Sequence, residues 1–214
     1  PQPVSSAAVR ARDAGRGIIR IKLRQSASDV NGGGCARFDP MQETSGHPAE
    51  VHPVSNPLTE LQPSRLWAHF DRIRSLPRAS GEEADVRRYV EQVAAERGWT
   101  VRTDRVGNLC VRVPATPSRA AARPVVLQAH LDMVCEKEPG LEFDFGREPI
   151  PVSVQGDWVT ATGTTLGADN GIGVAAALAV CEEPGVEHGP IELLLTVDEE
   201  AGGIGAEALE PGFV

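Results

Sequence analysis

The chain has 214 residues, of which 41% are apolar, so it is long enough to form one sizeable globular core. Its 21 basic and 30 acidic residues give a net charge of −9, which disfavours nonspecific attraction to nucleic acid or to an anionic membrane surface. No apolar run approaches the roughly 20 residues that span a bilayer, and the first residues lack the apolar core of a secretory signal.

The cysteines indicate a reducing environment. The chain has four of them, far apart and without a CxxC pair or the dense spacing of a disulfide-stabilised secreted domain: Cys35, Cys110, Cys135 and Cys181. We therefore expect a cytoplasmic protein in which these residues are ordinary thiols.

The first 40 residues differ from the rest of the chain in charge. They contain seven Arg or Lys and three Asp, a net charge of +4, which leaves −13 for the other residues. A change of this kind marks a domain boundary. With one short apolar cluster, residues 1–40 are expected to be disordered, or to be an extension upstream of a start at Met41. We interpret residues 41–63 as a linker and residues 64–214 as the folded part.

Two amphipathic helices are predicted at the start of the folded part. Apolar residues recur at spacings of four and three from residue 66 to residue 73, and Pro77 ends this first pattern. The second pattern opens with Ser80 and Glu83 at the spacing of a capping box, and it closes at Gly98.

The following segments predict strands and one further helix. Residues 99–113 and 151–163 each have the pattern of a β-hairpin. The apolar run at residues 124–134 is typical of a strand covered on both faces in the middle of a sheet, and residues 190–200 contain another buried strand. An alanine-rich helix is expected to start near Asp169. This alternation predicts an α/β fold.

The strand at residues 124–134 ends in His130 and Asp132. At a spacing of two, both side chains point to the same side of the strand. Open α/β sheets usually bind ligands at the carboxyl ends of their strands, and a metal-bound imidazole commonly donates its other N–H to a carboxylate. The commoner alternative for such a pair alone is a histidine that is simply hydrogen-bonded at the end of a strand.

Asp169 lies in the glycine-rich sequence TTLGADNGIG, residues 164–173. Asp and Asn can serve there simply as helix N-caps. However, neighbouring glycines also let the backbone approach closely, as a small metal site requires. The order of the glycines does not match GxGxxG, and no ribose-binding acid follows about 20 residues later, so a nucleotide-binding module is a weak alternative.

Three consecutive acids, Asp198, Glu199 and Glu200, follow the last apolar strand. Crowded carboxylates have raised pKa values or need a nearby cation, although a solvated turn before a helix is the simpler alternative. Together with His130 and Asp169, these acids follow three strand ends or helix starts. That pattern is typical of a two-metal hydrolase, whose cations lie roughly 3.5 to 4 Å apart and share a bridging carboxylate.

The segments that carry these residues also resemble a known family. VVLQAHLDMVCEK, TTLGADNGIGVAAALAV and HGPIELLLTVDEEAG are similar to sequences of the aminoacyl-histidine dipeptidases, also called cytosol nonspecific dipeptidases, of the M20 metallopeptidases. The likeness covers about residues 64–214. It implies a three-layer, zinc-peptidase-like α/β domain that has a mixed, mostly parallel central sheet flanked by helices and is incomplete at its C-terminus.

The resemblance also implies a role for each site residue. His130 is a ligand of one zinc ion, Glu200 a ligand of a second, and Asp169 bridges the two; Co²⁺ or Mn²⁺ are possible substitutes. Asp132 orients His130. Glu199 is the general base, which takes a proton from the metal-bridged water and returns it to the leaving amine. The implied substrates are dipeptides, including Xaa-His dipeptides, and the implied whole enzyme is a homodimer.

The sequence departs from the family pattern after Glu200. The family site uses one further acid and one further histidine, whereas this chain has no His and no Asp beyond that position. We expect the family's lid domain to be absent from it as well. His188 lies outside the matching motifs and is expected to be structural. We therefore expect the 214-residue chain to bind zinc weakly and not to turn over dipeptides. A non-catalytic metal-binding fragment is the alternative.

Overall fold

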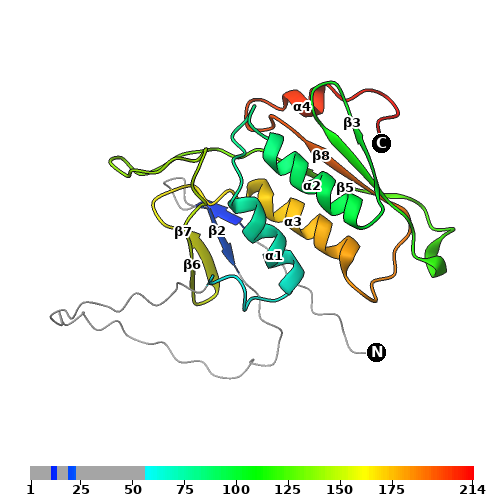
Figure 1. Ribbon diagram of the computed structural model, residues 1–214, viewed down its shortest axis with the longest axis horizontal. Helices are drawn as coiled ribbons and strands as arrows, with labels where there is room; N and C mark the ends of the chain where they lie inside the picture. Colours follow the sequence, from blue (N-terminus) through cyan, green and yellow to red (C-terminus); the bar gives the residue numbers. More distant parts are fainter. Residues whose placement is uncertain (1–10, 14–18, 23–55) are drawn as a thin grey trace.

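A computed structural model describes residues 11–13, 19–22 and 56–214 of the chain. Its main sheet has the strand order β3-β4-β8-β5 (Figure 1). The strands span Thr100–Thr103 (β3), Leu109–Val113 (β4), Ile191–Thr196 (β8) and Val125–His130 (β5). β4 pairs antiparallel with both β3 and β8, whereas β5 pairs parallel with β8.

The predicted mixed α/β sheet flanked by helices is therefore confirmed, but the expected majority of parallel pairs is wrong. Only one of the three pairings in the main sheet, β5 with β8, is parallel. The reason lies in the connections. β3 and β4 are joined by a short turn, which requires antiparallel strands, whereas a long crossover that includes a helix joins β5 to β8.

The prediction that the strand before His130 lies in the middle of a sheet is also wrong. Among the described residues β5 is an edge strand, and the side chains of Val125 and Val126 are 51% and 46% exposed. The central apolar strand is β8, in which five of six residues are buried. A run of apolar residues does not by itself distinguish the two positions, since it specifies burial but not pairing.

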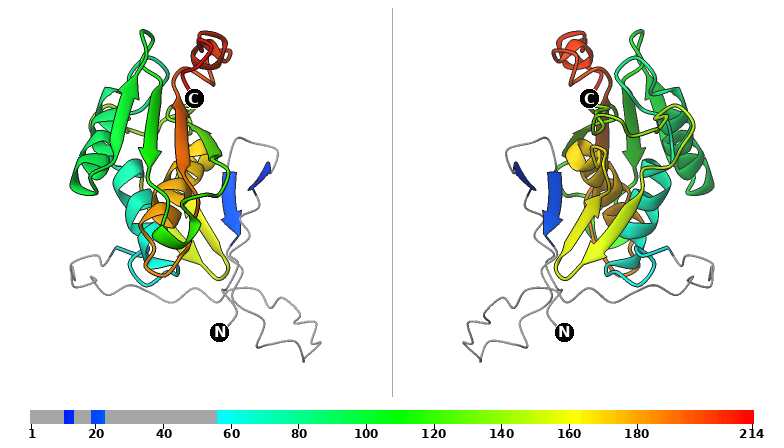
Figure 2. Two further views of the ribbon diagram at one scale, coloured as in Figure 1. Left: turned by 90° about the vertical axis from the view of Figure 1, so that its right-hand side faces the viewer. Right: turned by 90° about the vertical axis from the view of Figure 1, so that its left-hand side faces the viewer.

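Three helices pack on one face of this sheet: α1 (Ser64–Arg74), α2 (Ala84–Glu96) and α3 (Ala168–Glu182) (Figures 1 and 2). Alternate residues of β4 and β8, among them Val111 and Leu193, face these helices and form the main core. On the other face, Cys110 and Leu194 pack against Phe213 near the end of the chain. The predicted hairpin at residues 99–113 and the first two predicted helices are thus confirmed.

A second sheet has the order β1-β2-β7-β6. It contains the second predicted hairpin, β6 (Val152–Gln155) and β7 (Trp158–Ala161), and two short strands, β1 (Ala11–Asp13) and β2 (Ile19–Lys22). The seven residues of β1 and β2 form strands, whereas we expected residues 1–40 to be disordered. The described part does not include the rest of residues 1–40 or residues 41–55. The predicted start at Met41 therefore lies outside it.

The folded part begins before the predicted boundary at residue 64, because Leu58 is buried in the main core. A 3-10 turn at Pro117–Arg119 (η1) and a short helix at Ile204–Glu207 (α4) complete the described elements.

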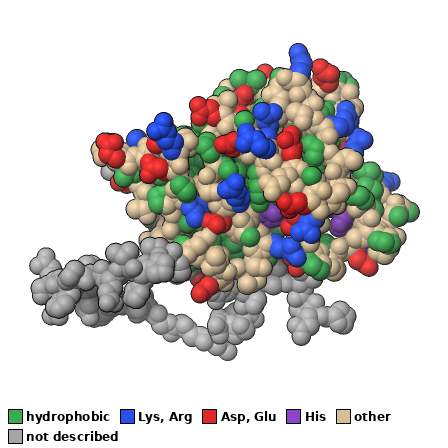
Figure 3. Space-filling model, viewed as in Figure 1, with side chains coloured by type: hydrophobic (Ala, Val, Ile, Leu, Met, Phe, Trp, Pro, Cys, Tyr) green, Lys and Arg blue, Asp and Glu red, His purple; other side chains and the backbone are tan. Residues whose placement is uncertain are grey.

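Among the described residues no helix combines the length and hydropathy needed to cross a membrane. Acidic and basic side chains are interspersed on the face shown in Figure 3.

Candidate metal centre

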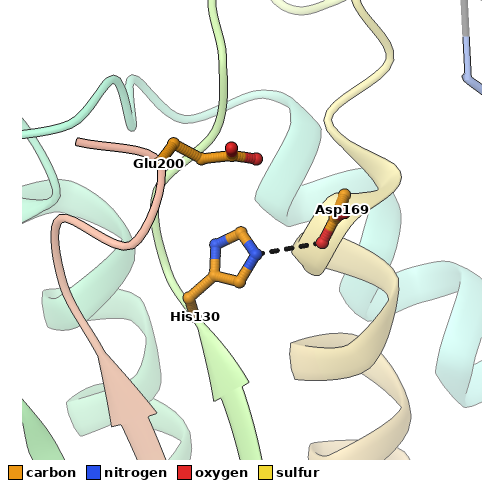
Figure 4. A group of neighbouring side chains, drawn as sticks. All are labelled: His130, Asp169 and Glu200. Carbon is orange, nitrogen blue, oxygen red and sulfur yellow. Dashed lines mark hydrogen bonds and ion pairs between the residues drawn. The ribbon is translucent and has the colours of Figure 1, made fainter. Parts of the chain in front are cut away.

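Three side chains from separate segments meet at one end of the main sheet (Figure 4). His130 is the last residue of β5, Glu200 lies in the loop after β8, and Asp169 is at the start of α3. One ligand atom from each residue lies within 4.8 Å of the others. The three segments that the sequence singled out are thus brought together at the carboxyl ends of two parallel strands, where such sheets bind ligands.

His130 is buried and has acidic groups at both ring nitrogens. Its Nδ1 lies 3.1 Å from the carbonyl oxygen of Asp132 and 3.3 Å from Oδ1 of the same residue. Its Nε2 lies 2.9 Å from Oδ1 of Asp169 and 3.8 Å from Oε2 of Glu199. Burial by itself lowers the pKa of His130, but the interactions with Asp132 and Asp169 outweigh it and raise the pKa.

Asp132 is fully buried and connects His130 to the acidic loop. Its Oδ2 accepts hydrogen bonds from the hydroxyl of Ser80 (2.7 Å) and the backbone N–H of Glu200 (3.0 Å). Its Oδ1 accepts from the backbone N–H of Glu199 (3.0 Å). Burial favours a raised pKa for Asp132, but the hydrogen bonds from His130, Ser80 and these N–H groups hold it well below its usual range. Asp132 therefore stays ionised at neutral pH.

The acidic loop after β8 is held through its backbone. Asp198 has a left-handed φ of 52°, and its N–H donates to Oε1 of Glu83 (2.9 Å). Consecutive N–H groups of residues 198–200 are thus bound by two carboxylates, which leaves the side chains of Glu199 and Glu200 free to face His130. Partial burial, together with the neighbouring acids, raises the pKa of Glu200 against the opposing effect of His130. A cation would relieve this repulsion.

The start of α3 is irregular in a way that exposes Asp169. Asp169 and Asn170 have non-helical φ/ψ angles, so the regular helix begins after them. A Cβ atom at Gly173 would overlap Oδ1 of Asn170, and one at Gly171 would lie 2.7 Å from Nη2 of Arg78. These glycines therefore permit close packing against Arg78 and Asn170, whereas the close approach of the backbone to a metal stays a prediction.

The capping-box prediction for Ser80 and Glu83 is wrong. α2 begins at Ala84 without a side-chain cap, and both residues instead bind the site: Ser80 donates to Asp132, and Glu83 accepts from Asp198. The motif is ambiguous because short polar side chains bond to whichever partner the fold brings near.

Asn108 lies inside the hairpin predicted at residues 99–113, and the sequence did not single it out for the site. Asn108 is fully buried. Its Oδ1 accepts from the N–H of Val197 (3.0 Å), and its Nδ2 donates to the carbonyl of Gly205 (2.7 Å). The side chain thus binds both ends of the acidic loop. No local pattern distinguishes such an asparagine from an ordinary turn residue.

The remaining histidine and cysteine predictions concern residues outside the cluster. Nδ1 of His188 lies 2.8 Å from the carbonyl of Gly189, away from the candidate ligands. Burial raises the pKa of the Cys135 and Cys181 thiols, the latter to about 12, so both carry little thiolate at neutral pH.

The donor set fits a divalent cation. One imidazole nitrogen and two carboxylates within 4.8 Å are the mixed N/O ligands that hydrolytic zinc sites use, and Co²⁺ and Mn²⁺ accept the same donors. A cation would offset the repulsion between the carboxylates of Asp169 and Glu200, which are both exposed beside the buried His130.

The chain is similar to known peptidases. Residues 126–213 match the profile of peptidase family M20/M25/M40. The chain is 49% identical over 157 residues to the cytosol non-specific dipeptidase of Escherichia coli, covering 73% of this chain and 32% of that protein. The crystal structure of aminoacylhistidine dipeptidase from Vibrio alginolyticus superposes with a TM-score of 0.72 at 48% identity, covering 74% of this chain and 32% of that one.

A more distant match is aminopeptidase PepT from Bacillus cereus, with a TM-score of 0.57 and 26% identity, covering 68% of this chain and 39% of that one. The chain spans about a third of the length of the two dipeptidases that it matches. His130, Asp169 and Glu200 all lie inside the segment that matches the family profile. The profile match, the sequence identity and the shared fold together show that this chain belongs to peptidase family M20/M25/M40.

Proposed function

We propose that the protein is a zinc-dependent peptidase that hydrolyses dipeptides, including Xaa-His dipeptides. The observation that carries the proposal is the convergence of His130, Asp169 and Glu200, from three distant segments, within 4.8 Å. The similar proteins support the substrate class: one is named a cytosol non-specific dipeptidase and another an aminoacylhistidine dipeptidase.

In this proposal the site holds two metal ions. His130 would hold one ion and Glu200 the other, and the Asp169 carboxylate would serve both. Bound divalent cations acidify water and polarise a scissile carbonyl. Asp132 holds the imidazole of His130 through its Nδ1 side, which leaves Nε2 directed toward Asp169.

Glu199 is the proposed general base. Its Oε2 lies 3.8 Å from Nε2 of His130, so Glu199 is close to the candidate metal ligands. Its side chain is 46% exposed, so a substrate can also contact it. The hydrogen bond from its N–H to Asp132 fixes the backbone position from which it acts. Glu199 takes a proton from the attacking water and delivers it to the leaving amine.

A non-catalytic metal-binding role is a second candidate. The cluster found among the described residues has three ligands, whereas catalytic zinc usually has three protein ligands and a water for each ion. Three ligands are enough to bind one cation but are too few for a complete dinuclear centre.

The metal centre is tested by zinc titration of the chain in competition with a chromophoric chelator. We expect His130→Ala, Asp169→Asn and Glu200→Gln each to weaken zinc binding by at least about tenfold, because each removes one donor of the set. His188→Ala is the control and leaves the affinity unchanged. If His130→Ala bound zinc as tightly as the unmodified chain, or if a nucleotide raised the melting temperature more than zinc does, the proposal would be wrong.

Catalysis is tested on the same chain with an Xaa-His dipeptide and zinc. Turnover that disappears in Glu199→Gln, while zinc affinity is retained, supports the general-base role and contradicts the expectation that the 214-residue chain is inactive. Zinc binding without turnover favours the metal-binding role for this chain.

We further propose a cytosolic location and, for the whole enzyme, a homodimer. The name of the Escherichia coli relative and the scattered cysteines support the first. The second rests on the family resemblance alone.

A further inference from the structure

Arg78 is a buried cation next to the candidate metal centre. Its side chain is only 2% exposed, and it is the only Arg or Lys among the buried residues of the described ranges. Burying a guanidinium is costly unless its donors are satisfied. Burial lowers the pKa of Arg78 to about 10, against the opposing effect of Cys135 and of the site's carboxylates, so the side chain stays charged at neutral pH.

The guanidinium joins the two segments that carry His130 and Asp169. Its Nη1 donates to the carbonyl oxygens of Leu131 (3.1 Å) and Asp132 (3.0 Å), just after β5. Its Nη2 donates to the carbonyl oxygen of Gly167, just before α3. One rigid group therefore spans two backbone segments that are 35 residues or more apart in the sequence.

The backbone of Arg78 strengthens the first of these connections. Its carbonyl oxygen accepts a hydrogen bond from the N–H of Met133 (3.0 Å), and Ala79 forms a parallel bridge with Met133. The segment that contains Arg78 therefore runs beside residues 131–133, and the Arg78 side chain extends from it to the start of α3.

The other side of the guanidinium is shaped by glycines. A Cβ atom at Gly167 would overlap Nη2 of Arg78, and one at Gly171 would lie 2.7 Å from the same nitrogen. The start of α3 thus lies against the guanidinium with no room for a side chain between them. A planar fork can reach carbonyls on both sides of such a narrow space, whereas the single ammonium of a lysine cannot.

We propose that Arg78 is a positioning residue of the metal centre: by binding the carbonyls of Leu131, Asp132 and Gly167, it sets the distance between His130 and Asp169. This inference rests on the proposed metal-dependent function, but the tie between the two segments exists without any metal. The two can therefore be tested separately.

The matched variants are Arg78→Lys and Arg74→Lys. Arg74 also donates to a distant backbone carbonyl, that of Ile150 (2.7 Å), but it takes no part in the cluster. In the metal-free chain, we expect Arg78→Lys to speed amide hydrogen exchange in residues 131–133 and in residues 167–171 together, and Arg74→Lys to leave both unchanged. Faster exchange in neither segment, or in only one, overturns the proposal.

The second readout is binding of Co²⁺, followed by its visible absorption spectrum. We expect Arg78→Lys to weaken Co²⁺ binding by about tenfold, as loss of an outer support of a metal ligand does, and to change the spectrum of the bound ion. Arg74→Lys changes neither. The spectrum is informative because a general loss of stability would not alter it in the molecules that remain folded. An unchanged spectrum, together with a Co²⁺ affinity within about twofold of that of the unmodified chain, overturns the proposal. Failure of the unmodified chain to bind Co²⁺ or Zn²⁺ would refute the proposed function, while hydrogen exchange still decides the role of Arg78.

Discussion

At the scale of single residues, Gly167 occupies a position that other residues fill only with strain. Its φ is 65°, in the left-handed region, and a Cβ atom there would overlap the side chains of Arg78 and Met133. Gly156 has a similar φ of 57°, but nothing lies within 4 Å of its Cβ position. The two glycines therefore separate the cost of the backbone conformation from the cost of overlap.

We predict that Gly167→Ala is clearly more destabilising than Gly156→Ala. The left-handed conformation alone costs about 1 kcal/mol, and overlap in a packed interior adds about 1–3 kcal/mol. Urea unfolding of both variants measures the difference in the free energy of unfolding. Equal losses in the two variants would show that the region around Arg78 relaxes freely.

At the scale of elements, one polar network joins the three long helices. His69 of α1 is buried, with its Nε2 3.1 Å from Oε2 of Glu182 in α3 and its Nδ1 2.7 Å from the hydroxyl of Tyr89 in α2. Burial lowers the pKa of His69 below 6.5, although Glu182 opposes this shift. Burial also raises the pKa of Tyr89 to about 12, so the tyrosine remains a neutral hydroxyl.

This network predicts a pH dependence of stability. Because the folded pKa of His69 lies below its unfolded value, the unfolded chain binds more protons as the pH falls through 6.5, and the folded state loses stability there. We expect the free energy of unfolding, measured with urea, to fall less between pH 7.5 and pH 5.5 in His69→Gln than in the unmodified chain. His188→Gln is the control, since His188 lies outside the network. If the free energy of unfolding fell as much in His69→Gln as in the unmodified chain, His69 would not be the cause of the pH dependence.

At the scale of the whole molecule, β5 presents an open edge in the described part of the chain. It pairs with β8 on one side, and its first residues, Val125 and Val126, are about half exposed. Unpaired apolar edges tend to add another strand. The net charge of −9 opposes association between copies, but it acts weakly at physiological salt, where charges are screened beyond about 8 Å.

We therefore predict that the 214-residue chain self-associates as its concentration rises, and that Val126→Lys reduces this by placing a charge on the edge. Sedimentation velocity over a range of concentrations measures the effect. Val180→Lys is the matched control, because Val180 is an exposed valine on α3 rather than on a strand edge. Equal suppression by both variants would indicate a general charge effect instead.

Sequence patterns were enough to predict the three long helices, both hairpins and the three segments that carry the candidate ligands. These features depend on local spacing, or on polar residues such as His130 at the end of an apolar run, where their cost is visible in the sequence. Three features became visible only in the folded chain: β5 is an edge strand among the described residues, Ser80 and Glu83 bind the site instead of capping a helix, and Arg78 joins two distant segments. Each of these depends on which distant segment lies next to the residue, and a local pattern does not specify that neighbour.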